Sequence, residues 1–150
     1  MSYPQHSTGM SSHPEIIEMR ERLERTAASN RAIVVEGLVV LAGVYAAISP
    51  WVVHFTGQPT VTVNNLIIGI TVALVGLGLT MAPERMFRLA WLLVPLGIWL
   101  IITPWVVPAA HGSRAGIIWN NAWVGAITAL LGLAAMGLTV GLTRRTHHHR

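Results

Sequence analysis

A six-residue element, Ile48-Ser49-Pro50-Trp51-Val52-Val53, occurs a second time as Ile102-Thr103-Pro104-Trp105-Val106-Val107. The two copies lie 54 residues apart and differ only where Ser49 is replaced by Thr103, which also carries a hydroxyl. Each copy stands at the end of a long apolar segment. A match of this kind indicates that the chain uses one structural unit twice.

The repeat extends beyond this element. Asn64-Asn65 recurs as Asn120-Asn121 with an offset of 56, so the second connecting loop is two residues longer. Tyr45 aligns with Trp99. Small residues also align, in the pairs Gly43 with Gly97, Gly69 with Gly125, Ala73 with Ala129 and Gly76 with Gly132.

The composition is that of a membrane protein. Hydrophobic residues make up 53% and charged residues 11% of the 150 residues, and the mean hydropathy is +0.56. Because soluble domains are typically about 25% charged, this chain cannot cover the surface of a soluble globule. The same apolar content excludes disorder over most of the chain.

Four apolar segments are long enough to cross a bilayer, which needs about 20 residues per helix. We expect an all-α, polytopic membrane protein with spans at Ala32–Val53, Val63–Ala82, Met86–Val107 and Trp119–Leu142. Helices are expected because lipid offers no partner for an unpaired backbone group. The predicted organisation is an N-terminal arm (1–30), a first two-helix repeat (31–83), a second two-helix repeat (84–142) and a tail (143–150).

The arginines predict the orientation. Nine of the ten basic residues fall in the arm, the middle loop or the tail, and Arg114 alone falls in an opposite loop. Positive residues accumulate on the cytoplasmic side, so both termini are expected in the cytoplasm and the segments His54–Thr62 and Pro108–Ile118 outside. The two repeats then share one orientation and are related by an axis along the membrane normal. The exclusive use of Arg as the basic residue suggests a GC-rich bacterial genome and hence the inner membrane.

The doubled Ser/Thr-Pro-Trp-Val-Val element resembles that of the SPW-repeat family of small integral membrane proteins. The resemblance covers about residues 31–136, and Thr103 is a conservative departure from the motif. It implies a membrane protein of two repeats. It implies no enzymatic activity and no catalytic residue.

Each Pro-Trp element has a structural interpretation. Pro50 and Pro104 remove one backbone donor near the outer end of a helix, and the hydroxyl of Ser49 or Thr103 can donate to a carbonyl one turn back. Trp51 and Trp105 would then anchor the helix ends at headgroup depth. The alternative is that the two elements form an outer-leaflet pocket for a lipid or quinone.

The asparagines and the small residues favour helix packing. Asn64-Asn65 and Asn120-Asn121 open the second helix of each repeat, where they are expected to act as N-caps or to bond between helices. A ligand site is the alternative, although four amides without a carboxylate suit a cation poorly. The small residues are expected on helix contacts within the bundle or, alternatively, on a dimer contact. They are Gly43, Gly69, Ala73, Gly76, Gly97, Gly125, Ala129 and Gly132.

Glu36 is the one acid inside a predicted span, close to its cytoplasmic end. It is shallow enough to reach water or to pair with Arg31 or Arg88, and the alternative is a role in proton coupling. Its counterpart in the second repeat is Ala90, so there is no symmetric carboxylate pair.

The N-terminal arm combines two patterns. Residues 1–12 are polar and are predicted to be disordered. A short helix is expected over Pro14–Ala27, with Ile16, Met19 and Leu23 forming a narrow apolar stripe. That helix would be either a solvated extension or a docking element.

No residue set predicts catalysis. The chain has no Cys and no Asp, and its histidines lie outside the predicted spans. We expect no enzyme activity, no cofactor, no metal site and no nucleic-acid partner. Three functions remain open: an accessory or scaffolding subunit of a larger inner-membrane complex for envelope lipid transport or respiration, a small homo-oligomeric transporter or channel, and an outer-leaflet lipid or quinone binder. The partners would be the bilayer and either larger subunits or a second copy.

Overall fold

The computed structural model describes residues 13–82, 87–107 and 114–147. All regular structure in these ranges is helical, and the helices run in the order α1 (Pro14–Val52), α2 (Pro59–Met81), a 3-10 helix η1 (Phe87–Leu92), α4 (Leu93–Val106) and α5 (Arg114–His147). Four stretches among them are long and apolar enough to cross a membrane. The expected all-α, four-span architecture is confirmed, whereas residues 1–12, predicted to be disordered, lie outside the described ranges.

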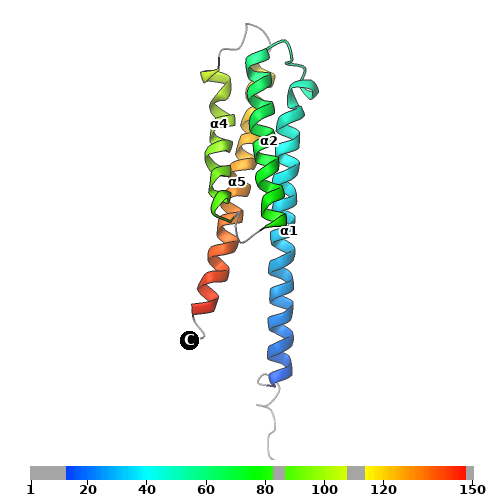
Figure 1. Cartoon of the computed structure of the whole chain (residues 1–150), viewed down its shortest axis with the longest axis vertical. Helices are drawn as coiled ribbons and strands as arrows, with labels where there is room; N and C mark the ends of the chain where they lie inside the picture. The colour runs from blue at the N-terminus through cyan, green and yellow to red at the C-terminus, as the bar shows by residue number, and fades with distance from the viewer. Residues whose placement is uncertain (1–12, 83–86, 108–113, 148–150) are drawn as a thin grey trace, which may run out of the picture.

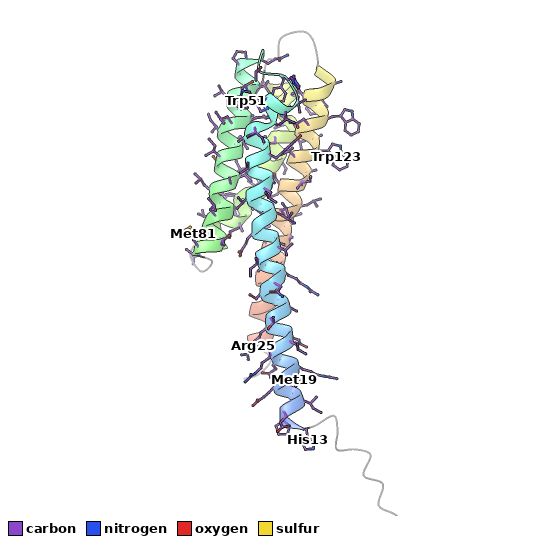
Figure 2. The ribbon with its side chains drawn as sticks, turned by 90° about the vertical axis from the view of Figure 1, so that its right-hand side faces the viewer. His13, Met19, Arg25, Trp51, Met81 and Trp123 are labelled. Atoms are coloured by element: carbon purple, nitrogen blue, oxygen red, sulfur yellow. The ribbon has the colours of Figure 1, made fainter. Side chains whose placement is uncertain are left out.

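The helices form two hairpins that pack side by side (Figure 1). The most extensive contacts join α1 to α2 and α4 to α5, and the hairpins meet where α1 packs on α5 and α2 on α4. The helices therefore surround a common centre in the order α1, α2, α4, α5. We call the end that holds Trp51 the elbow end and the end that holds Met81 the terminal end (Figure 2).

Helix α1 is one uninterrupted element where the sequence suggested two. The expected short helix Pro14–Ala27 and the expected first span are both parts of α1. The cause is local, because no Gly or Pro occurs between Glu15 and Glu36 to interrupt the backbone hydrogen bonds. At about 1.5 Å per residue the 39-residue helix is about 58 Å long. Figure 1 shows it continuing past the end of α2, and Figure 2 shows it continuing past the level of Met81.

The other helices differ from the expected spans at their first turns. Helix α2 begins at Pro59, which occupies the first turn and needs no backbone partner there. The third span, Arg88–Val106, opens as the 3-10 helix η1 before α4 takes over. Pro95 explains this change, because a proline cannot donate the bond that an α-helix would make to the carbonyl of Trp91.

The elbow end is closed by a small apolar cluster. Beyond the end of α1, His54 adopts a left-handed backbone (φ 61°), and the amide of Phe55 donates to the carbonyl of Pro50 at 2.9 Å. This turn buries Phe55 against Val61 of α2 and Ile117 of α5. The start of α5 is thereby held against the first hairpin.

The bundle has a small interior and an apolar exterior. Its core contains residues such as Val39, Val72 and Leu93, which are at most 1% exposed. By contrast, Leu41 and Leu130 are 65% and 63% exposed on the outer faces of their helices. A surface this apolar is covered by lipid in a protein of this class.

Glycines bring the two helices of each hairpin into backbone contact. A Cβ placed on Gly43 would collide with the backbone of Gly69 and Ala73, and one on Gly69 would collide with that of Gly43 and Ala47. In the second hairpin a Cβ on Gly97 would lie 2.5 Å from the Gly125 carbonyl oxygen. These four glycines are buried, so they serve contacts within the hairpins and are not available to a second copy.

The remaining small residues extend these contacts. A Cβ on Gly76 would lie 2.8 Å from the Val40 side chain, and a Cβ on Gly132 would lie 2.8 Å from the Leu93 side chain. Ala73 and Ala129 provide the backbone that faces Gly43 and Gly97. Every small residue that the repeat predicted for packing therefore lies on an α1–α2 or an α4–α5 contact.

The glycine contact can be tested by adding one methyl group. Gly43→Ala must push α1 and α2 apart, and we expect it to lower the free energy of unfolding by about 1–3 kcal/mol. The measurement is reversible unfolding in detergent, monitored by circular dichroism. Gly37→Ala is the matched control, because a Cβ at Gly37 meets nothing within 4 Å. Equal stability of the two variants would contradict the close approach.

Candidate functional site

The four asparagines lie inside helices and do not cap them. The N-cap of α2 is Gln58, so Asn64 and Asn65 fall in the second turn. Helix α5 begins at Arg114, which places Asn120 and Asn121 in its second turn as well. Of the two predicted roles the structure supports bonding between helices and not capping, because each helix starts earlier than its apolar pattern indicated.

Asn65 and Asn121 form a reciprocal amide pair in the centre of the bundle. The Asn65 Nδ2 donates to the Asn121 Oδ1 at 2.8 Å, and the Asn121 Nδ2 donates to the Asn65 Oδ1 at 3.3 Å. Asn65 is 1% exposed and Asn121 is fully buried. Helices α2 and α5 face each other across the bundle with little other close contact, so this pair reaches between the two hairpins through the centre.

The neighbouring asparagines connect this pair to the aromatic residues on the facing helices. Asn64 Oδ1 accepts from the Trp99 Nε1 at 2.9 Å. Asn120 Oδ1 accepts from the Tyr45 hydroxyl at 3.1 Å. Tyr45 and Trp99 hold matched positions in the two repeats, so the two hydrogen bonds are related by the approximate two-fold symmetry of the bundle.

The hydroxyls of the Pro-Trp elements join the same network. Ser49 Oγ donates at 2.8 Å to the carbonyl of Ala46, which is the carbonyl that Pro50 leaves without its helical donor. The same oxygen accepts from the Asn65 Nδ2 at 3.2 Å. One hydroxyl therefore satisfies the freed carbonyl and binds the central amide.

The second element behaves similarly but not identically. Thr103 Oγ1 donates to the carbonyl of Trp99 at 2.7 Å and accepts from the Asn64 Nδ2 at 3.2 Å. The carbonyl that Pro104 frees is that of Leu100, one residue further along. The two hydroxyls also bind different asparagines of the same helix, Asn65 for Ser49 and Asn64 for Thr103.

We call this set the amide cluster, and its hydrogen bonds complete one another. Asn64 Nδ2 also lies 3.5 Å from the Asn65 Oδ1, and Asn120 Nδ2 donates to the Asn121 Oδ1 at 3.2 Å. Both oxygens of the central pair then accept two hydrogen bonds each. The cluster is made of these eight residues: Tyr45, Ser49, Asn64, Asn65, Trp99, Thr103, Asn120 and Asn121.

The amide cluster consists of uncharged polar groups that join the helices to one another. It contains amides, hydroxyls and two aromatic donors, and it includes no carboxylate, imidazole, amine or guanidinium group. Hard cations prefer carboxylate ligands, which the cluster lacks. Across the described ranges of the chain, no three His, Asp or Glu side chains gather closely enough to hold a metal ion.

The remaining predicted residues lie apart from the cluster. Trp51 and Trp105 are 54% and 56% exposed near the elbow end, in the outer turns of their helices. Figure 2 shows Trp123 projecting from the bundle near the same end; its ring stacks on that of Trp119 with centroids 6.5 Å apart. These exposed rings suit the headgroup region.

Glu36 lies toward the terminal end of α1, half-buried beside the Thr80 side chain of α2. Arg25 pairs with Glu21, and within the described ranges no ion pair joins Glu36 to Arg31 or to Arg88. Its counterpart Ala90 is fully buried in the core. Glu84 of the middle loop lies outside the described residues.

The sequence did not assign a role to Tyr45 or Trp99. Their signal was nonetheless present, because each precedes the Ser/Thr of its Pro-Trp element by four residues and so lies on the same helix face. Each also carries one polar atom at the edge of an apolar ring, and within an apolar surrounding such an atom usually finds a hydrogen-bond partner.

Comparison with known proteins gives one result. The family model described as SPW repeat domain matches residues 33–135. This range contains both Pro-Trp elements and all residues of the amide cluster. No match was found among curated proteins or among solved structures.

Removing the Ser49 hydroxyl tests whether the first Pro-Trp element stabilises the amide cluster. Ser49→Ala deletes the donor to the Ala46 carbonyl and the acceptor of Asn65, so we expect unfolding in detergent to become easier by about 1–2 kcal/mol. Thr71→Ala is the control, because the Thr71 hydroxyl binds only the Ile67 carbonyl of its own helix on an exposed face. If Ser49→Ala and Thr71→Ala lower the free energy of unfolding equally, the Ser49 hydroxyl has no stabilising role beyond its own helix.

Proposed function

The chain belongs to the SPW repeat family, and we propose that it is a non-catalytic integral protein of a bacterial inner membrane. We propose further that it serves there as an accessory or scaffolding subunit of a larger complex, of the kind that carries out envelope lipid transport or respiration. The amide cluster keeps the two hairpins in register, and the long α1 helix presents a docking surface to the partner.

The observation that carries this proposal is the extension of α1 beyond the bundle. The 18 residues Pro14–Arg31 precede the predicted first span, which corresponds to about 27 Å of helix. Three apolar side chains spaced by three and four residues form a stripe on this extension: Ile16, Met19 and Leu23 are 39%, 64% and 63% exposed. A continuous apolar stripe left open to water is typical of a helix that binds a partner.

The opposite face of the extension is suited to water. Glu21 and Arg25 lie about half a turn from the stripe and approach within 3.4 Å of each other at the surface. Because the extension is continuous with the first span, a partner docked on the stripe would be held rigidly relative to the membrane.

The interior of the bundle supports a scaffold more than a transport pathway. Its centre is filled by paired amides, whereas ion and proton pathways through membranes commonly use ionisable side chains. Glu36 lies toward the terminal end and faces α2.

The arginine distribution supports the orientation. Helix α1 begins and helix α5 ends toward the terminal end (Figure 1), and along the sequence nine of the ten basic residues fall in the arm, the middle loop or the tail. We therefore propose that the terminal end faces the cytoplasm.

Affinity purification of the full chain from native membranes in mild detergent, followed by mass spectrometry, tests the role. We expect larger membrane subunits to co-purify in fixed stoichiometry. Replacing Ile16, Met19 and Leu23 by Gln should remove at least about nine tenths of these subunits, because it deletes the apolar contact. The matched control replaces Glu21 and Arg25 by Gln on the opposite face and should retain them.

Two results would contradict the proposal. One is recovery of the chain alone or only with further copies of itself. The other is equal partner recovery with the stripe variant and its control, which would place the contact elsewhere.

A further inference from the structure

A groove opens between α1 and α5 at the terminal end, far from the amide cluster. Its volume is about 580 Å³, within the range of roughly 300–1,000 Å³ that small-molecule sites occupy. Arg31, Val34 and Val35 line it from α1, and Ala134, Gly137 and Leu138 line it from α5. Figure 1 shows the two helices running apart toward this end.

The groove combines an apolar wall with one positive charge at its mouth. Val34, Val35 and Leu138 provide aliphatic surface suited to a hydrocarbon chain, and Asn30 adds an amide beside Arg31. Arg31 precedes Val34 and Val35 by three and four residues, so it lies one turn nearer the N-terminus on the same side of α1. The arginine therefore lies closer to the membrane edge of the predicted first span than the two valines do.

We propose that this groove binds one anionic phospholipid of the leaflet at the terminal end. The Arg31 guanidinium receives the phosphate, for which its planar set of donors is well matched. The acyl chain lies along Val34 and Val35 and fills the space above Gly137. This site is distinct from an outer-leaflet pocket at the Pro-Trp elements, which lie at the other end of the bundle.

Charge complementarity identifies the occupant. Arg31 forms no ion pair with a carboxylate in the described part of the chain, and it immediately precedes the predicted first span, at headgroup depth. Anionic lipid attracts such a residue near the membrane surface. A free phosphate ion would make no apolar contact with the valines, and an apolar helix would leave the arginine without an opposite charge.

Gly137 offers a way to close the groove without disturbing the fold. A Cβ at Gly137 meets nothing within 4 Å, and the same holds for Gly37 of α1, which does not line the groove. Gly137→Leu therefore fills the site, and Gly37→Leu adds the same side chain at another open position. The pair separates occupation of the groove from a general effect of leucine.

The test is native mass spectrometry of the full chain released from detergent, with phosphatidylglycerol or phosphatidylcholine of identical acyl chains added at known concentrations. We expect one phosphatidylglycerol per chain, bound at least about five-fold more tightly than phosphatidylcholine. Gly137→Leu should lower the bound fraction of both lipids several-fold, whereas Gly37→Leu should leave it unchanged. Arg31→Gln should reduce phosphatidylglycerol to the level of phosphatidylcholine.

Several results would overturn the proposal. Equal lipid retention by the two leucine variants would show that the groove is not the site. Retention of the phosphatidylglycerol preference in Arg31→Gln would remove the phosphate contact, and this variant serves even if Gly137→Leu fails to fold. A dimer mass that Gly137→Leu abolishes would assign the groove to a second copy.

Discussion

An amide buried at the centre of a membrane bundle must find its hydrogen bonds within the protein, because lipid supplies none. Asn65 and Asn121 meet this requirement by pairing with each other across the bundle axis. The geometry of two facing amides fixes the height of α2 relative to α5, so a slip of either hairpin by one turn would break both hydrogen bonds of the pair. The register of the bundle thus depends on this pair together with the bonds of Asn64 and Asn120 to the facing hairpin.

Two kinds of contact hold the bundle together, and they act at different places. Within each hairpin, glycines such as Gly43 and Gly97 allow the backbones to touch, and the attraction is van der Waals packing. Between the hairpins, the hydrogen bonds of the amide cluster are directional, so they orient one hairpin relative to the other. The Pro-Trp elements contribute to both places, because the Ser49 hydroxyl binds Asn65 within the first hairpin and the Thr103 hydroxyl accepts from Asn64 between the hairpins.

The sequence was sufficient to predict the four spans, the two repeats and the packing role of the small residues, because these depend on composition and periodicity. The first residues of the helices were harder to predict from the sequence. Helix α2 begins at Pro59, ahead of the apolar run, and Asn64 and Asn65 are therefore not caps. The third span starts as a 3-10 helix because Pro95 cannot donate a hydrogen bond to the carbonyl of Trp91. The partners of the asparagines could not be predicted, because they depend on how two hairpins meet across the bundle.

The central claim is that the two amides stabilise the bundle by pairing, and a double-mutant cycle tests it most directly. The free energy of unfolding in a bilayer is measured for the unaltered chain, Asn65→Leu, Asn121→Leu and the double variant. The account predicts a coupling energy of about 1–2 kcal/mol, because each single variant removes the partner of the other amide across the bundle. A coupling energy within about 0.3 kcal/mol of zero would show that the two side chains act independently and would contradict the account.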